Sequence, residues 1–186
     1  EKMTTSNQLN PGMIISINNS LYKVESSVKV AAPKGAPFIK TKLKDLTTNE
    51  LIEKSFKLGQ AIKDVSLVEK RLEFLYPEGE TFLFLDIVNL DQINIPSQII
   101  GDKVNYLKEG VEIKASLYGE IVFAVEMPQF LELMVAKTMN DEEKVLLSES
   151  KVIVLETGAT VEVPPFIEVG DIIKVDTRTD EYIQRV

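Results

Sequence analysis

The sequence predicts an all-β protein built from three consecutive small β-barrels. Short segments in which apolar and polar residues alternate recur along the chain, and turn signals such as Asn18-Asn19-Ser20 and Pro77-Glu78-Gly79-Glu80 separate them. Only 89–100 has room for a helical turn or two, and Pro96 limits its length. Many short strands without long amphipathic helices are typical of small barrels.

The strands are expected where this alternation is clearest. In the first third they are 13–17, 21–25, 38–43 and 51–56. In the central third they are 72–76, 81–85, 111–117 and 121–125. The last third adds 131–138, 152–155, 160–163, 172–176 and 181–185.

Charge and proline placement predict where one barrel ends and the next begins. Residues 1–64 carry 10 lysines against 6 acidic residues, a net charge of +4, whereas 65–186 carry 11 basic against 23 acidic residues, a net charge of −12. A second boundary is expected at Met127-Pro128, giving domains 1–64, 65–128 and 129–186. Each is near the lower size limit for an independent core, so we expect them to pack end to end in an elongated molecule.

The composition narrows the classes of function. The chain has no cysteine and no histidine, which excludes thiolate chemistry and removes the usual general base and the commonest metal ligand. A run of acids at Asp141-Glu142-Glu143 is more typical of a solvated loop than of a metal site, which needs oxygen ligands at defined spacings. We therefore expect no enzyme, no catalytic residue, no metal and no cofactor.

The location expected from the sequence is the cytoplasm. No apolar run approaches the roughly 20 residues that span a membrane, and the N-terminal residues lack the apolar core of a signal peptide. Absence of cysteine suits a reducing compartment. We expect no membrane contact and a monomer.

Residues 30–44 carry the strongest functional signal. Lys34 lies at the tip of a loop shaped by Pro33, Gly35, Ala36 and Pro37. In the strand that follows, alternation places Lys40, Lys42 and Lys44 on one face, roughly 6.6 Å apart, and Lys29 on the entering strand is expected to extend this basic patch. That spacing resembles the spacing of phosphates along a nucleic-acid strand, although exposed lysines also serve solubility and edge protection.

Ordered motifs along nearly the whole chain resemble translation elongation factor P. The N-terminal motifs are Leu9-Asn10-Pro11-Gly12-Met13, Pro33-Lys34-Gly35 with Phe38, Lys42-Leu43-Lys44-Asp45-Leu46 and Glu53-Lys54-Ser55-Phe56-Lys57. The C-terminal motifs are Leu155-Glu156-Thr157-Gly158-Ala159, Val163-Pro164-Pro165-Phe166-Ile167, 170–179 and Glu181-Tyr182.

The resemblance implies a KOW/SH3-like N-terminal barrel followed by two OB-fold barrels, in a molecule shaped like a transfer RNA. It implies binding to the ribosome and ribosomal RNA next to peptidyl-tRNA, contact with the acceptor arm and CCA end, and relief of stalling at consecutive prolines. By position, Lys34 would reach towards the peptidyl transferase centre. In many family members this lysine is extended by a modification such as β-lysylation, so a lysine-modifying enzyme acting on Lys34 is an expected partner.

Two departures from the family pattern leave open whether the chain is a divergent paralogue. Pro33 stands directly before the lysine, where many members have a more glycine-rich loop. The acidic segment 139–151 lacks glycine where members have Gly-Asp-Thr and further glycines, which puts a small-subunit contact in doubt. A generic OB/KOW RNA-binding or transcription-associated module is the alternative function. Phe82, Phe84 and Tyr118 are either core residues or a base-stacking surface.

Overall fold

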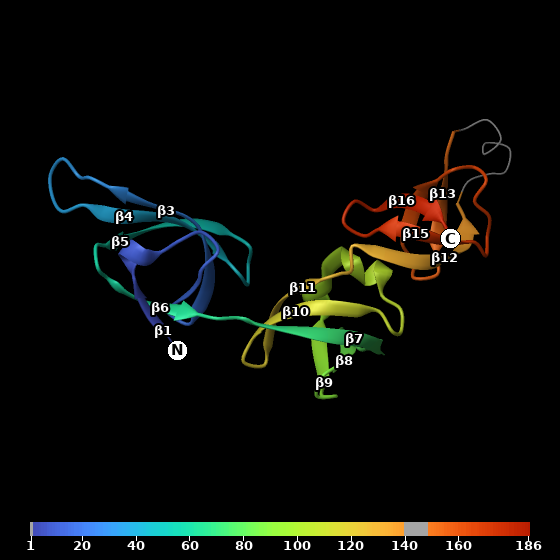
Figure 1. Cartoon of the computed structure of the whole chain (residues 1–186), viewed down its shortest axis with the longest axis horizontal. Coiled ribbons are helices and arrows are strands. Elements are labelled where there is room, and N and C mark those ends of the chain that lie inside the picture. The colour runs from blue at the N-terminus through green and yellow to red at the C-terminus, as the bar shows by residue number, and fades with distance from the viewer. Residues whose placement is uncertain (1, 140–148) are drawn as a thin grey trace. The chain divides into compact units, whose positions relative to one another are not determined.

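The computed structural model describes residues 2–139 and 149–186, and its strands form sheets of six, five and five members. These confirm the all-β expectation (Figure 1). The chain divides into two compact units, Glu1–Val68 with Leu117–Phe123, and Glu69–Ser116 with Ala124–Val186. We describe each unit by itself. Among the described residues, no helix is long and apolar enough to cross a membrane.

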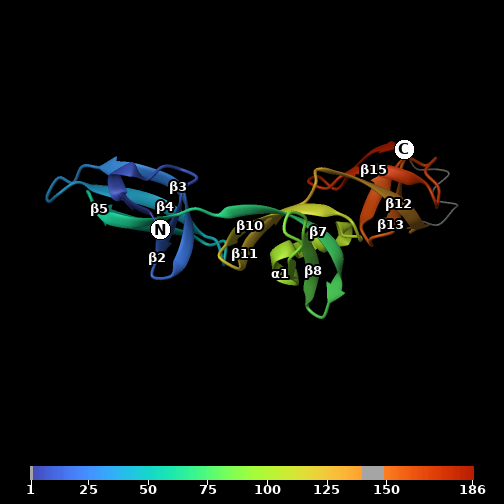
Figure 2. The ribbon, with the colours of Figure 1, turned by 60° about the horizontal axis from the view of Figure 1, so that its bottom comes forward.

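The first sheet curls on itself in the manner of a half-barrel (Figure 2). Its strand order is β1-β6-β2-β3-β4-β5. The bounds are β1 Lys2–Thr5, β2 Ile14–Ile17, β3 Ser20–Val30, β4 Phe38–Asp45, β5 Leu51–Lys57 and β6 Ala61–Val65. A short 3-10 turn, η1 Ser6–Gln8, follows β1. Curling brings the inward side chains of the strands together in one core, whose buried members are Leu9, Ile15, Val24, Ile39, Leu43, Phe56 and Ile62.

The second sheet has the order β11-β10-β7-β8-β9. Its strands are β7 Val68–Glu78, β8 Thr81–Asp86, β9 Gln92–Pro96, β10 Glu112–Tyr118 and β11 Ile121–Glu126. The expected helical turn is present as α1 Ser97–Ile100, continued by the 3-10 helix η2 Gly101–Tyr106. Phe84 is fully buried and its ring centroid lies 5.3 Å from that of Phe74, so this aromatic is a core residue rather than a stacking surface.

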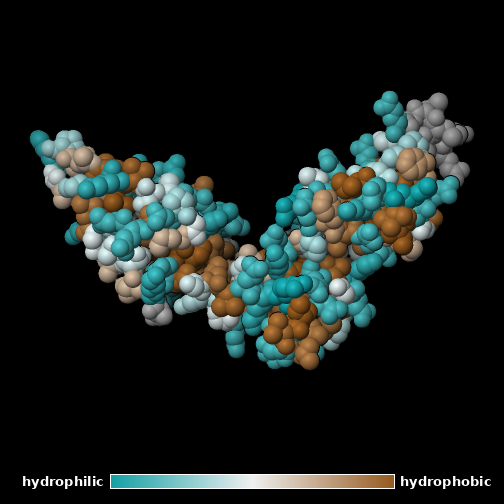
Figure 3. All heavy atoms as spheres, viewed as in Figure 1, coloured by the Kyte–Doolittle hydropathy of each residue, from teal (hydrophilic) through white to brown (hydrophobic). Residues whose placement is uncertain are grey.

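The third sheet has the order β14-β13-β12-β15-β16. Its strands are β12 Phe130–Thr138, β13 Lys151–Leu155, β14 Thr160–Val163, β15 Ile172–Asp176 and β16 Glu181–Arg185. Fully buried Leu133, Val135, Ile153, Ile173 and Val175 form its core. Hydrophilic residues cover much of the visible surface of the molecule, interrupted by separate hydrophobic patches (Figure 3).

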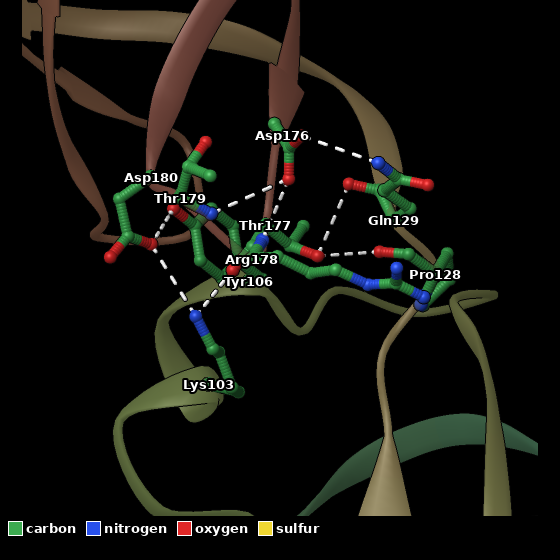
Figure 4. Close-up of polar contacts among 9 residues, drawn as sticks. All are labelled: Lys103, Tyr106, Pro128, Gln129, Asp176, Thr177, Arg178, Thr179 and Asp180. Atoms are coloured by element: carbon green, nitrogen blue, oxygen red, sulfur yellow. Dashed lines mark hydrogen bonds and ion pairs between the residues drawn. The ribbon is translucent and has the colours of Figure 1, made fainter.

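Polar contacts join η2 to the turn between β15 and β16 within the second unit (Figure 4). The Tyr106 hydroxyl donates to Oδ1 of Asp180 at 2.5 Å. Lys103 donates to the carbonyl of Thr177 and lies 3.6 Å from Asp180. The Thr177 hydroxyl in turn donates to the carbonyl of Pro128 at 2.6 Å. Because Tyr106 and Thr177 are buried, these bonds satisfy groups that would otherwise be costly to remove from water.

Three turns, each joining the last two strands in the order of its sheet, share one pattern of hydrogen bonds. They are residues 45–50, 86–91 and 176–181, and we call them the Asp turns. In each, Oδ1 of the first aspartate accepts the backbone N–H groups two and three residues later, at 2.8 to 3.4 Å. In each, the fifth residue has left-handed backbone: Asn49 has φ 62°, Leu90 has φ 66° and Asp180 has φ 60°.

Three strands of the structure were not expected from the sequence: β1, β6 and β9. Strand β1 is short and polar, and it is held by pairing with β6, which places Lys2 opposite Asp64. Strand β9 ends at Pro96 and pairs with β8 on one side only, as an edge strand that tolerates proline. The alternation of residues within one segment cannot reveal these strands, because each is held by pairing with another segment of the chain.

Candidate nucleic-acid interface

Lys34 lies in the loop that joins β3 to β4, and its side chain is exposed. The last pair of the ladder, Val30 with Phe38, closes this loop at its base. Gly35 has φ +115° and no other atom lies within 4 Å of where its Cβ would be, so glycine is needed there for the backbone conformation and not for lack of space. The hairpin therefore presents an exposed lysine in its connecting loop. Figure 1 shows this loop between β3 and β4.

The alternation expected for β4 is present. Ile39, Thr41 and Leu43 are buried, whereas Lys40 and Lys42 are exposed and Lys44 is partly exposed. On the buried side, the Thr41 hydroxyl donates to the carbonyl of Lys54 at 2.7 Å, which satisfies the one polar side chain in this stretch of core. The strand that carries the lysines is thus held by its buried face.

The strand register adds two lysines that alternation within β4 could not identify. Lys23 of β3 pairs with Lys44, and Lys57 of β5 pairs with Phe38, so both lie on the outward face of the sheet. Both side chains are exposed. We call this set the lysine face: Lys23, Lys40, Lys42, Lys44 and Lys57. Their positions along each segment would have suggested an outward direction, but not which strand lies beside which.

An acidic residue of β5 shares this face. Glu53 of β5 pairs with Lys42, and its carboxylate lies 3.9 Å from the ammonium of Lys40. Both side chains of this ion pair are more than half exposed, at 52% and 60%, so water screens the attraction. The lysine face therefore keeps a positive balance along β4.

Lys29 lies on the other face of the hairpin, because β3 contains a bulge between Val24 and Ser26. The bulge leaves Glu25 unpaired and reverses the side on which later residues of β3 point. Lys29 consequently pairs with Ile39, a residue of the buried side of β4, and not with Phe38. The structure brings Lys40, Lys42 and Lys44 together and places Lys29 apart from them, near the base of the Lys34 loop.

We call residues 65–186, which carry the net charge of −12, the acidic unit. In residues 2–139 and 149–186, no group of three or more acidic side chains is placed to hold a metal ion. The acidic run Asp141-Glu142-Glu143 and most of segment 139–151 lie outside the described residues. An open pocket of about 320 Å³ is lined by two arginines, but Arg71 pairs with Glu112 at 2.7 Å and Arg178 with Glu126 at 3.2 Å.

Family models match the chain in three successive parts. Residues 5–62 match the model described as the elongation factor P (EF-P) KOW-like domain. Residues 67–125 match the elongation factor P (EF-P) OB domain, and 131–185 match elongation factor P, C-terminal. Together these models account for most of the chain.

Full-length relatives are similar over the same span. The chain is 72% identical to "Elongation factor P 1" of Protochlamydia amoebophila over 184 residues, which is 99% of this chain and 100% of that protein. It is 49% identical to "Elongation factor P 1" of Chlamydia pneumoniae, and 37% identical to "Elongation factor P" of Coprothermobacter proteolyticus, each over 99% of this chain and 100% of the relative.

Solved structures with little sequence identity share the fold. Eukaryotic translation initiation factor 5A from Methanococcus jannaschii aligns with a TM-score of 0.55 at 13% identity, covering 67% of this chain and 95% of that one. A translation initiation factor eIF-5A family protein from Naegleria fowleri aligns with a TM-score of 0.56 at 9% identity, covering 68% of this chain and 98% of that one.

Proposed function

Because the chain belongs to the elongation factor P family of translation factors, we propose that it binds the ribosome beside peptidyl-tRNA and stimulates peptide-bond formation where synthesis stalls at consecutive prolines. The observation that carries the proposal is the β3–β4 hairpin, which has exposed Lys34 at its tip and the lysine face along its length. A hairpin of this kind is suited to follow an RNA strand and to place one amine beyond it.

The lysine face supplies the sequence-independent part of binding. Lysines two residues apart on β4 are separated by about 6.6 Å, and lysines on neighbouring strands by about 4.8 Å. Several ammonium groups at such spacings neutralise successive phosphates and release their counterions, which favours association. In the proposal the phosphates belong to the acceptor arm of peptidyl-tRNA and to ribosomal RNA. Lys29, on the other face, contacts RNA on that side of the hairpin.

Lys34 acts by position and not as a catalyst. Beyond the end of the lysine face, its amine contacts the CCA end of peptidyl-tRNA and holds the ester in a reactive geometry. Fixing reactants in this way lowers the entropic part of the barrier for a reaction that the ribosome already catalyses. Proline is a constrained nucleophile, so positioning contributes most there. Pro33 and Pro37 limit the freedom of the loop before binding and so reduce the entropy lost on docking. Gly35 and Ala36 leave space around the amine.

The charge division supports the same arrangement. Residues 1–64 carry the net charge of +4 and residues 65–186 the net charge of −12. In the proposal the functional domains are 1–64, 65–128 and 129–186, of which the first meets RNA phosphates. The acidic remainder limits non-specific RNA binding because like charges repel. The factor acts as a cytoplasmic monomer without cofactor, metal or catalytic residue.

A modified Lys34 is part of the proposal. The exposed side chain is accessible to a lysine-modifying enzyme, and an added aminoacyl group would lengthen the arm and supply further amines. The intact mass of the protein purified from its native source tests this point. A mass equal to that of the unmodified chain would show that Lys34 works as a bare lysine there.

Reconstituted translation of a message encoding Pro-Pro-Pro tests the function directly. Lys34→Ala is expected to abolish the increase in full-length peptide that the intact protein gives, with an unchanged circular dichroism spectrum. Lys137→Ala is the matched control, since it removes an exposed lysine from the acidic unit. An unaltered peptide yield with Lys34→Ala would overturn the role of Lys34. A generic RNA-binding module would show weaker RNA binding in this variant but no stimulation by the intact chain.

A further inference from the structure

Leu90 stands out among the residues with left-handed backbone. In residues 2–139 and 149–186, the non-glycine residues with positive φ are Asn18, Asn19, Asn49, Asp180 and Leu90. Asparagine and aspartate adopt this conformation readily because their short polar side chains bond locally, whereas it is unfavourable for a bulky apolar residue. The Asp turn at 86–91 therefore holds a leucine where the other two Asp turns hold Asn49 and Asp180.

Burial does not explain the leucine. Leu90 is 68% exposed and Val88, two residues earlier in the same turn, is 86% exposed. Neither side chain gains much from the core of its own barrel, so the unfavourable backbone is not offset by packing. Strained residues that the surrounding structure imposes are frequent at functional sites.

Hydrogen bonds to Asp86 fix the turn at 86–91. Asp86 is buried, accepts the N–H groups of Val88 and Asn89 at 2.9 and 3.4 Å, and pairs with Lys70 at 3.4 Å. The N–H of Leu90 also donates to the carbonyl of Asp86 at 2.8 Å. Two branched apolar side chains thus project from a rigid support, which reduces the entropy that docking would cost.

In another Asp turn, the residues that correspond to Val88 and Leu90 bind side chains of neighbouring strands or helices. In the turn at 176–181, Asp180 occupies the place of Leu90 and accepts the Tyr106 hydroxyl. Arg178 occupies the place of Val88 and pairs with Glu126 at 3.2 Å. Both partners come from the second sheet or the helix beside it. The same two turn positions can therefore serve as a docking point, with polar contacts in one turn and apolar side chains in the other.

We propose that Val88 and Leu90 form an apolar knob that docks into an apolar depression on a basic protein of the ribosome. This inference rests on the proposed function. Charge selects the partner: exposed Asp91 follows the knob, and residues 65–186 carry the net charge of −12, so RNA phosphates are repelled and a basic protein surface is favoured. Two aliphatic side chains offer no hydrogen bonds to a base, which again favours a protein.

Site-specific photocrosslinking tests the partner's class. The full chain carries p-benzoylphenylalanine either at Val88 or, for comparison, at Ala36 in the Lys34 loop, and is irradiated on ribosomes stalled at Pro-Pro-Pro. We expect a Val88 adduct that survives ribonuclease and is lost with proteinase. An RNA adduct at Val88, or no Val88 adduct while Ala36 crosslinks, overturns the knob and leaves the proposed function standing. Loss of both adducts overturns the two together.

Binding to the same ribosomes gives an independent test. The double substitution Val88→Thr with Leu90→Asn is expected to weaken binding by about tenfold, because truncating central apolar contacts commonly has an effect of this size. Val169→Thr is the matched control, since Val169 is 60% exposed elsewhere in the acidic unit. The variant should keep its circular dichroism spectrum and melt no lower than the parent. Unchanged affinity in the double variant would overturn the proposal.

Discussion

The hydroxyl of Tyr106 donates a 2.5 Å hydrogen bond to the carboxylate of Asp180, a residue 74 positions later in the chain. Burial, followed by the adjacent carboxylate, raises the pKa of Tyr106 well above its usual range. The phenol therefore stays protonated and keeps donating. This contact and the neighbouring contacts of Lys103 join η2 to the third sheet.

Removing both partners of this bond should reveal their coupling. Tyr106→Phe deletes the donor, and Asp180→Gly deletes the acceptor while keeping a residue that tolerates φ 60°. A double-mutant cycle on the free energy of urea unfolding is expected to give a coupling of about 1.5 to 3 kcal/mol, the usual value for a hydrogen bond to a charged acceptor. Additive effects of the two substitutions would show that the bond contributes nothing in solution.

Acid should destabilise the chain through two of the Asp turns, those at 86–91 and 176–181. The N–H of Val88 lowers the pKa of Asp86, and the N–H of Arg178 lowers the pKa of Asp176. A carboxyl whose pKa is lower in the folded than in the unfolded state contributes stability above about pH 4 and loses it as the pH falls further. The urea concentration at the midpoint of unfolding should therefore be lower at about pH 3 than at about pH 5.

Asp86→Asn isolates one of these groups. The amide oxygen still accepts a backbone N–H but no longer titrates, so the drop in the unfolding midpoint on acidification should be smaller than in the parent. Asp91→Asn, an exposed carboxylate at the end of the same turn, serves as the control. An equal pH dependence in the parent and Asp86→Asn would contradict the assignment.

The lysine face should set the salt dependence of ribosome binding. Each of Lys40→Ala, Lys42→Ala and Lys44→Ala is expected to reduce the slope of log K against log[KCl] by about 0.7 to 0.9, the value per phosphate contact. The measurement is made at constant Mg²⁺, with Lys137→Ala as the control. Lys29→Ala reports separately on the opposite face of the hairpin. Slopes that match the parent in all three variants would remove the lysine face from the interface.

Exchanging the left-handed residues of two Asp turns should change stability in opposite directions. Leu90→Asn relieves an unfavourable backbone and is expected to stabilise by about 1 kcal/mol, whereas Asn49→Leu introduces one and should destabilise by about as much. Thermal and urea unfolding measure both. Asn49→Gly separates backbone strain from loss of the side chain. If Leu90→Asn lowered stability instead, Leu90 would be making stabilising contacts within its own barrel.

The sequence predicted most strands but not their neighbours. Alternation identified residues 38–43 as a strand and put Lys40 and Lys42 on its outward face, because side-chain direction has a period of two within one segment. Lys23 and Lys57 were missed as members of the lysine face because their place depends on which strands pair. The left-handed backbone of Leu90 was not predicted either, because a bulky apolar residue rarely adopts it.

The bulge in β3 has an evolutionary consequence. Because Glu25 is the one unpaired residue between Val24 and Ser26, its deletion would remove the bulge and still leave Lys29 opposite Ile39. The position of the bulge matters more than its presence. A bulge placed beyond Lys29 would continue the register of Val24 with Leu43 and put Lys29 opposite Phe38, on the lysine face. Homologues that lack one residue at this point are therefore expected to keep the same basic face, whereas homologues whose bulge lies closer to the loop are expected to gain a cation on it.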